Sequence, residues 1–368
     1  MANIRVPDPR RVAAAIAAPL IAVAIAGGVS AVLLVLTGHD PAVVLNTLGN
    51  RLGETNTLMD AANRAIPLYL SGIAVAVGFK MNLFNIGVEG QYKVGALTAA
   101  VLGAAVTLPG PLHVVFCLLA GLIGGALWAT VPAVLKVKRG INEVVSTIML
   151  NFIAISLVAW LYTGVFKGSA AGELNTRTKY LPESAWMPDL VSNGSHRVNS
   201  FAIVAVLVGV AYYLLVWKSR FGFQLRASGA NPFAARTSGV DPTKMVFRAM
   251  LISGAAAGLV GLPELLGDKH AYTDTFSVGL GFDGIAVALL GRKHPIGIAI
   301  GALVWGFLDA AGRFLDLDGI PREIVTILQG VIVLAVVITY QVAEQFAQRR
   351  ITAETAAKAE RLDLEVAG

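Results

Sequence analysis

Long runs without charged side chains dominate the hydropathy pattern of this chain and predict helices that cross a membrane. Four such runs lie at residues 14–36, 144–166, 198–217 and 324–343. The hydrocarbon core of a bilayer is about 30 Å thick, so a helix needs about 20 apolar residues to cross it. Lipid cannot satisfy exposed backbone groups, whereas a helix pairs them internally. Each run therefore predicts one transmembrane helix.

Further apolar segments raise the expected number of crossings to about ten. Residues 94–135 form one uncharged run interrupted by Pro109-Gly110-Pro111, which predicts two helices joined by a tight turn. Shorter apolar segments lie at 65–79, 249–263, 278–291 and 294–311. The pattern leaves open whether 278–291 is a full crossing or re-entrant. We predict an all-α polytopic membrane protein.

Glycine spacing within these segments predicts close helix packing. Three pairs have GxxxG spacing, namely Gly121/Gly125, Gly254/Gly258 and Gly297/Gly301. Small residues at this spacing let helix backbones approach closely, which favours packing over a role in ligand binding.

Composition excludes a soluble enzyme, a disordered scaffold and a nucleic-acid binder. Hydrophobic residues make up 56% of the chain and charged residues 14%, whereas average soluble chains carry roughly 25% charged residues. The mean hydropathy is +0.70. The net charge of +6 needs no nucleic acid, because membrane proteins concentrate Lys and Arg in cytoplasmic loops.

The distribution of basic residues predicts that both termini are cytoplasmic. With ten crossings and a cytoplasmic N-terminus, most of the 29 Lys and Arg residues fall in cytoplasmic segments. We expect a transmembrane domain over residues 1–343 and a charged cytoplasmic tail over 344–368. Within the domain, 218–245 is cytoplasmic and 167–200 is an external loop.

The cytoplasmic loop 218–245 contains the signals of a short, deliberately capped helix. Asn231 is a good N-cap and Pro232 suits the first helical position. Gly239 supplies a C-terminal stop, and Asp241-Pro242 repeats the start signal for the next helix. Such a short helix is marginal in water by itself, so we expect it to dock into a partner. A solvated basic loop would explain the charges but not the caps.

Four motifs follow one another in the chain. LRAxGxNPxAAxxxG spans 225–239, and the other three are FNIGVEGQ at 84–91, NEVVSTIMLN at 142–151 and GFDGIAVALLG at 281–291. The first resembles the coupling segment of permeases in the ribose/branched-chain amino-acid class of ABC importers. The other three resemble signatures of its nucleoside and simple-sugar subgroup. We therefore call residues 218–245 the coupling segment.

The resemblance implies a type II importer subunit in the bacterial plasma membrane. It implies three partners: a second homologous permease that forms a heterodimer, a cytoplasmic ABC ATPase, and an external substrate-binding lipoprotein. The chain has no G-x-x-x-x-G-K-[ST] loop, so ATP and Mg are expected on the ATPase and this chain is not an enzyme. The residues expected to couple to the ATPase are Arg226, Gly229, Asn231, Pro232, Phe233, Ala234, Ala235 and Gly239.

Two alternatives stay open for the external loop 167–200. It contains both basic residues (Lys167, Arg177) and acids (Glu173, Glu183). Mixed charge suits a platform for a binding protein, but a solvated connector would look the same, and for any individual residue we favour the connector.

Polar residues inside apolar spans are candidates for the substrate pathway, because an ionisable group at mid-helix costs about 3 kcal/mol. A continuous helix over 82–93 would place Asn82, Asn85 and Glu89 on one face. Lys93 follows Glu89 by four residues, the spacing of a helical ion pair. Glu89 is therefore either neutralised by Lys93 or in contact with substrate.

Amide, carboxylate and aromatic side chains match the chemistry of a nucleoside, which offers base edges, ribose hydroxyls and a π-face. The predicted pathway residues are Asn82, Phe84, Asn85, Glu89, Asn151, Phe282 and Asp283. Asp283 stands between Gly281 and Gly284, where a broken helix would leave it as a pathway residue or as a structural cap. No spacing typical of a metal site is present.

Alternative functions remain at this point. A simple sugar is the nearest alternative substrate. An ion-coupled secondary transporter would use Glu89 or Asp283 to carry the coupling ion. A membrane enzyme would need carboxylate or histidine clusters at a membrane face, which the sequence lacks. The motifs at 84–91 and 281–291 also suggest a weak internal duplication, in which they occupy equivalent places in two halves.

Overall fold

The computed structural model describes residues 9–170, 173, 175–317, 319–321, 323–342 and 345. It divides into two compact units, and we describe each by itself. The terminal unit comprises residues 1–47 and 312–368, and the central unit comprises residues 48–311. The predicted tail at 344–368 lies outside the described residues except for Gln345.

The terminal unit contains α1 (Pro9–Leu36), the first half of α2 (Pro41–Leu52), the end of α13 (Pro295–Leu317) and the helix Glu323–Val342. The last two form a hairpin. Its turn contains Gly319, whose φ is +79°. The Ile320 N–H donates to the Leu315 carbonyl at 2.9 Å, and Gly312 faces the side chain of Val325.

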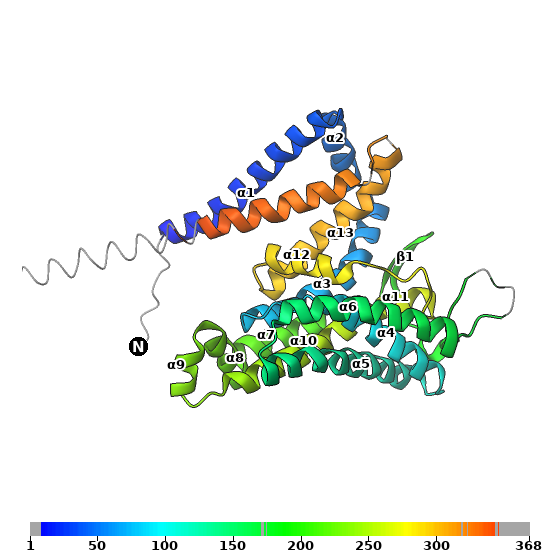
Figure 1. Ribbon diagram of the computed structural model, residues 1–368. Coiled ribbons are helices and arrows are strands. Elements are labelled where there is room, and N and C mark those ends of the chain that lie inside the picture. Colours follow the sequence, from blue (N-terminus) through cyan, green and yellow to red (C-terminus); the bar gives the residue numbers. More distant parts are fainter. Residues whose placement is uncertain are drawn as a thin grey trace, which may run out of the picture. The chain divides into compact units, whose positions relative to one another are not determined.

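The central unit is a helical bundle with one small β-hairpin on its surface (Figure 1). Its longer helices are α3 (Thr55–Lys80), α4 (Val88–Ala104), α5 (Gly110–Arg139), α6 (Glu143–Trp160), α7 (Phe201–Tyr213), α8 (Arg220–Ala230), α10 (Pro242–Gly258), α12 (Leu280–Leu290) and most of α13. Its short elements are α9 (Pro232–Thr237), α11 (Leu262–Glu264), the 3₁₀ turn Glu183–Ala185, and the strands β1 (Asp189–Asn193) and β2 (His196–Asn199). Single π-helical turns follow three of the helices at Leu161–Val165, Leu214–Lys218 and Leu265–Lys269.

The prediction of an all-α polytopic bundle is confirmed. Seven helices in the described ranges are long and apolar enough to cross a membrane, namely Thr55–Lys80, Gly110–Arg139, Glu143–Val165, Phe201–Lys218, Pro242–Lys269, Pro295–Leu317 and Glu323–Val342. Shorter apolar helices lie at Val23–Leu36 and Leu280–Leu290. Together with α4 they make ten apolar helices, which is roughly consistent with the expected number. The run at 94–135 is indeed two helices, because α4 ends at Ala104 and α5 begins at Gly110.

The segment 278–291 is a half-length helix. α12 has 11 residues, about 16 Å at 1.5 Å per residue, so it cannot cross a bilayer core alone. The hydroxyl of Ser71, near the middle of α3, donates to the Leu280 carbonyl at 2.7 Å. α12 therefore begins in the interior of the bundle. Non-helical chain leads to it from the end of the helix Pro242–Lys269.

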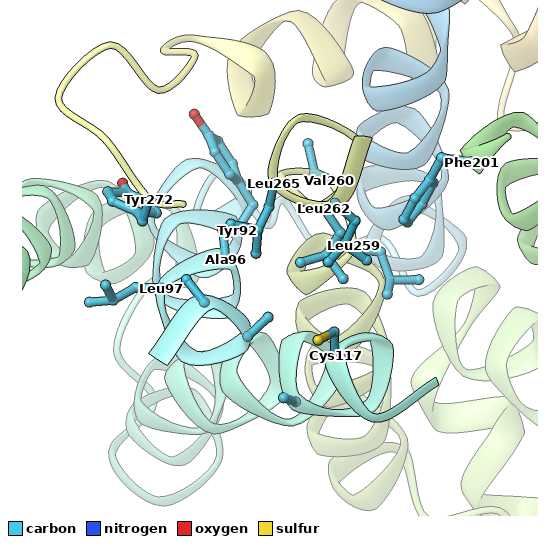
Figure 2. Packing of buried hydrophobic residues seen from close by; sticks show 14 of the residues in the cluster. Tyr92, Ala96, Leu97, Cys117, Phe201, Leu259, Val260, Leu262, Leu265 and Tyr272 are labelled. Atoms are coloured by element: carbon cyan, nitrogen blue, oxygen red, sulfur yellow. The ribbon is translucent and has the colours of Figure 1, made fainter. Parts of the chain in front are cut away.

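Glycine allows α5 and α10 to pack backbone to backbone, as the GxxxG spacing predicts. A Cβ on Gly258 would lie 2.0 Å from the Gly121 carbonyl oxygen, and one on Gly125 would lie 2.2 Å from the Gly254 carbonyl oxygen. Beside this crossing lies a hydrophobic core from several helices (Figure 2), with Tyr92, Leu265 and Phe201 fully buried.

Adding one methyl group at this crossing should destabilise the bundle. We expect Gly258→Ala to lower the free energy of unfolding by about 1–3 kcal/mol, because the helix backbones must separate to admit the Cβ. The matched control is Gly164→Ala, since no heavy atom lies within 4 Å of the added Cβ there. Thermal melting of the detergent-solubilised protein measures both variants. Equal melting midpoints for Gly258→Ala and the unmodified protein would contradict the close packing.

The external loop 167–200 is folded against the bundle. Its backbone N–H groups at Thr178, Leu181 and Met187 donate to the carbonyls of Tyr272, His270 and Leu266 at 3.0, 2.8 and 2.8 Å. The β2 strand is tied to α3, where the Asn199 N–H donates to Asn63 Oδ1 at 3.0 Å. The backbone of the loop is therefore attached to the bundle, while charged side chains such as Lys167 and Glu173 are exposed, so the connector interpretation of individual residues stays a prediction. The exposed β1 strand leaves the platform alternative open.

Candidate functional site

Glu89 joins two helices that both begin inside the bundle. It lies in the first turn of α4 and is 1% exposed. Its carboxylate accepts hydrogen bonds from the backbone N–H groups of Gly279 at 3.0 Å and Gly281 at 2.9 Å, at the start of α12. A carboxylate at a helix N-terminus is favoured by the helix dipole. The N-termini of α4 and α12 therefore both stabilise this one charge.

Lys93 supplies the counter-charge for Glu89. Its Nζ lies 3.8 Å from Glu89 Oε1 and donates to the Ser277 carbonyl at 3.2 Å. The Tyr92 hydroxyl donates to the same Glu89 oxygen at 3.1 Å. The expected Glu89–Lys93 ion pair is confirmed. With these partners the carboxylate already makes structural contacts, and whether it also touches substrate stays a prediction.

Asn85 holds together the irregular chain that precedes α4. Its amide exchanges two hydrogen bonds with the Gln91 amide, at 2.9 and 3.0 Å. It also donates to Ser253 Oγ at 2.8 Å, and the Ser253 hydroxyl donates to the Ala74 carbonyl at 2.6 Å. Asn85 is 1% exposed. Its amide therefore links α4, α10 and α3 through a buried polar network.

Asn151 performs the same task from α6. Its Oδ1 accepts from the Gly90 N–H at 2.9 Å, and its Nδ2 donates to the Ile86 carbonyl at 2.9 Å. Irregular backbone is tolerated at membrane depth only where protein or water satisfies it. Asn85, Asn151 and Glu89 satisfy that backbone for the starts of α4 and α12, and we call them the junction residues.

Residues 82–93 do not form one continuous helix, so the condition for a shared face is not met. Helix α4 begins at Val88, and the preceding residues form turns and irregular chain. Asn82 has a φ of +57°, a left-handed conformation that a helix does not admit. Asn82 therefore does not share a helical face with the junction residues. It lines a separate cleft of about 430 Å³ beside the coupling segment, together with Lys136, Gly229 and Pro232.

The remaining pathway candidates have free surface. Phe84 is 45% exposed and its ring packs on Phe79 at a centroid distance of 4.7 Å, while Phe282 on α12 is 49% exposed. Asp283 is partly buried in the first turn of α12, and no hydrogen bond or ion pair of its side chain occurs among the described residues. Glu89 makes the hydrogen bonds to the start of α12, so the cap alternative for Asp283 is not supported.

The coupling segment folds as its cap signals predict. Asn231 Oδ1 accepts from the N–H groups of Phe233 at 3.0 Å and Ala234 at 3.1 Å, which starts α9. Gly239 ends it with a φ of +78°. Asp241 Oδ1 then accepts from the N–H groups of Thr243 and Lys244 to start α10. The bond from the Lys244 N–H holds the pKa of the Asp241 carboxyl below its usual value.

Helix α9 turns an apolar side chain outward while it stays attached to the bundle. Phe233 is 80% exposed, whereas Ala235 on the opposite side is 2% exposed. The preceding α8 lies against the end of α3, where a Cβ on Gly229 would lie 2.4 Å from the Lys80 carbonyl oxygen. The Arg226 guanidinium donates to the Val216 carbonyl at the end of the α7 span. Helix α9 is therefore attached through α8 to the ends of α3 and of the α7 span.

The chain thus combines a junction of two helix starts inside the bundle with a short capped helix, α9. We next compared its sequence with known protein families. Residues 57–337 match the family model described as branched-chain amino acid transport system / permease component. The chain belongs to this family. The matched range of this permease includes both the junction residues and the coupling segment.

Individual relatives of this permease are named for particular substrates. The guanosine ABC transporter permease protein NupP of Bacillus subtilis is 34% identical over 88% of this permease and 93% of its own length. The glucose ABC transporter permease protein TsgB13 of Haloferax volcanii is 33% identical over 89% of each chain. The nucleoside ABC transporter permease protein NupB of Lactococcus lactis is 29% identical over 88% of this permease and 90% of its own length.

Two of these organisms have a second ABC transporter permease with a related name, and this second protein is less similar in sequence to our permease. NupQ of Bacillus subtilis is 27% identical over 70% of this permease, and NupC of Lactococcus lactis is 25% identical over 70%. The homologues of this permease therefore come in pairs. A solved metal-chelate type ABC transporter in an inward-facing conformation aligns at 18% identity over 77% of this permease and 84% of that chain, with a TM-score of 0.43. This score is too low to establish a common fold.

Sequence reasoning missed two members of the junction. Gln91 stands inside the motif at 84–91, and its amide pairs with Asn85. Ser253 lies on α10 and bridges Asn85 to α3. Gln91 could have been identified from the sequence, because it is a polar residue within the motif at 84–91. No local pattern distinguishes Ser253 from other small residues of α10.

Proposed function

We propose that this ABC permease imports nucleosides together with a second, non-identical permease. A cytoplasmic ATPase that binds ATP and Mg supplies the energy, and an external substrate-binding lipoprotein delivers the substrate. The complex lies in the bacterial plasma membrane with both termini of the permease in the cytoplasm. The positive-inside distribution of Lys and Arg supports this orientation.

The single observation that carries this proposal is the construction of α9. An exposed Phe233 on a helix capped at both ends suits an anchor that enters a pocket of a partner. Side-chain caps stabilise a helix that would otherwise barely form. The contacts of α8 with α3 and α7 then give the motion a direct route into the bundle.

Nucleosides are favoured over sugars by the relatives and by the available side chains. NupP and NupB are named for guanosine and nucleosides. The exposed rings of Phe84 and Phe282 offer π-faces for a base, and Asp283 has an acceptor available for ribose hydroxyls. The similarity to TsgB13, a glucose permease, keeps a simple sugar as the second candidate.

Uptake of labelled substrate by cells tests this proposal. Cells that express the permease with the proposed ATPase, second permease and lipoprotein should accumulate labelled guanosine, and unlabelled nucleosides but not glucose should compete. Deletion of the permease gene should abolish the uptake. Glucose-specific competition would favour the sugar alternative. Uptake by the purified permease alone in vesicles, driven by an ion gradient without ATP, would replace the proposal with a secondary transporter.

A further inference from the structure

An apolar groove runs between α3, α7 and α13 in the central unit. It encloses a cavity of about 680 Å³. Alanine and other apolar residues form nearly all of its lining, and the polar groups on it come from Tyr69, Tyr213 and His294. A nucleoside in this groove would leave most of its polar edges unpaired, which is costly away from water. The groove therefore suits a hydrocarbon chain.

Aromatic side chains close one end of the groove. Tyr213 and His294 both contact Trp217, at ring-centroid distances of 5.6 and 5.4 Å. Lys80 Nζ lies 4.5 Å above the Trp217 ring. The Tyr212 hydroxyl donates to the Lys293 carbonyl at 2.9 Å. Tyrosine and tryptophan prefer the boundary between hydrocarbon and headgroups, so this end of the groove marks a membrane interface.

Three cations meet at the same end without an acid to balance them. Lys80 Nζ lies over the Trp217 ring, and Lys293 Nζ lies 5.5 Å from the ring centroid of Phe79, the residue before Lys80. The Arg226 guanidinium donates to the carbonyl of Val216, the residue before Trp217. None of the three forms an ion pair with an Asp or Glu within the described ranges. Lys80 is the last residue of one candidate span, and Lys293 comes just before another. Like charges at this boundary repel unless an anion binds between them.

We propose that the groove and these cations form a binding site for an anionic phospholipid. One acyl chain lies in the groove between α7 and α13, and the phosphate lies between Lys80 and Lys293 beside Trp217. Charge complementarity selects this occupant, because an uncharged or zwitterionic lipid leaves the cations without net compensation. The site joins α3 to α13 at the end of the bundle that carries the coupling segment. The inference needs only the membrane embedding of the permease and is independent of the imported substrate.

Native mass spectrometry of the full-length permease in mild detergent tests the site. The probes are phosphatidylglycerol and phosphatidylcholine with identical palmitoyl and oleoyl chains. We expect phosphatidylglycerol to be retained preferentially. Lys80→Gln with Lys293→Gln should weaken its retention by about 25-fold, because each cation near an anionic headgroup contributes about 1 kcal/mol and 1.4 kcal/mol is a factor of ten.

Three further variants make the result decisive. Lys138→Gln with Arg139→Gln removes the same charge from exposed residues at the end of α5 and should leave retention unchanged. Lys80→Arg with Lys293→Arg keeps both charges and should retain phosphatidylglycerol. This result would show that the loss in the glutamine variant comes from the missing charges and not from substitution at these two positions. Ala299→Phe fills the groove and should reduce retention of phosphatidylglycerol while both cations remain.

Three results would overturn the proposal. They are equal retention of the two lipids, equal losses in the two glutamine variants, and unchanged retention in Ala299→Phe.

Discussion

Phe233→Ala is expected to reduce the affinity of the permease for the proposed ATPase partner by at least about thirty-fold and to abolish ATP-driven uptake. The ring is 80% exposed on a helix of six residues, so its packing contributes nothing comparable to the fold of the permease itself. Aromatic anchors that fill a partner's pocket typically contribute about 2 kcal/mol or more. Co-purification of the ATPase with the tagged permease, and uptake by intact cells, measure the two effects.

Phe223→Ala is the matched control for this prediction. Phe223 lies on the neighbouring helix α8 and its side chain is 63% exposed. The substitution removes a ring that is also mostly exposed and lies on the helix next to α9 in the chain, so it should leave association and uptake near their original values. Equal losses in the two variants would show that the whole surface, rather than the α9 anchor, is sensitive.

A second variant tests the helix rather than the ring. Asn231→Leu with Pro232→Gly removes the N-cap bonds to Phe233 and Ala234 and the preset backbone of the first turn. We expect it to uncouple ATP hydrolysis from transport. Unchanged transport together with unchanged ATPase association in this double variant would refute docking by α9.

The coupling segment could be predicted from sequence because its signals are local. Asn231, Pro232, Gly239 and Asp241 each act on backbone groups within a few residues, and the structure shows every one in its expected place. Apolar run length predicted the spans for the same reason, and Pro109-Gly110-Pro111 marks the start of α5, which follows the end of α4 at Ala104. Such features depend on near neighbours in the chain.

The junction could not be predicted because its partners are remote in sequence. Glu89 bonds to Gly279 and Gly281, some 190 positions later. Helical periodicity over 82–93 could not show that the Asn82 backbone is left-handed. Nor could it show that Asn85 Oδ1 accepts a hydrogen bond from the Gly87 N–H at 3.1 Å. Local polarity showed which residues matter, but only the tertiary pairing shows that they hold two helix starts together.

Both motifs that suggested an internal duplication stand at this junction. The motif at 84–91 leads into α4, and the motif at 281–291 forms most of α12. Each helix begins inside the bundle, and the two starts share the Glu89 carboxylate. The two motifs therefore meet in space at the starts of α4 and α12, while the internal duplication stays a prediction.

Glu89→Ala is expected to destabilise the permease by about 3–5 kcal/mol. Removing one member of a buried ion pair leaves the other charge uncompensated. The Lys93 side chain is 7% exposed, and the N–H groups of Gly279 and Gly281 would also lose their acceptor. Thermal melting in detergent measures the loss. Asp189→Ala is the control, because this carboxylate lies on the exposed strand β1 and its removal changes the net charge equally.

A double variant separates the ion pair from the backbone bonds. Glu89→Gln with Lys93→Met removes both charges and keeps one amide oxygen for the start of α12. Replacing a buried ion pair as a unit is often nearly neutral, so we expect most of the stability to return. If Glu89→Ala has the same melting midpoint as the unmodified protein but no uptake, Glu89 contacts the substrate and does not hold the junction together. Loss of stability in Glu89→Ala, restored with uptake in the double variant, establishes that Glu89 acts by holding α12 on α4.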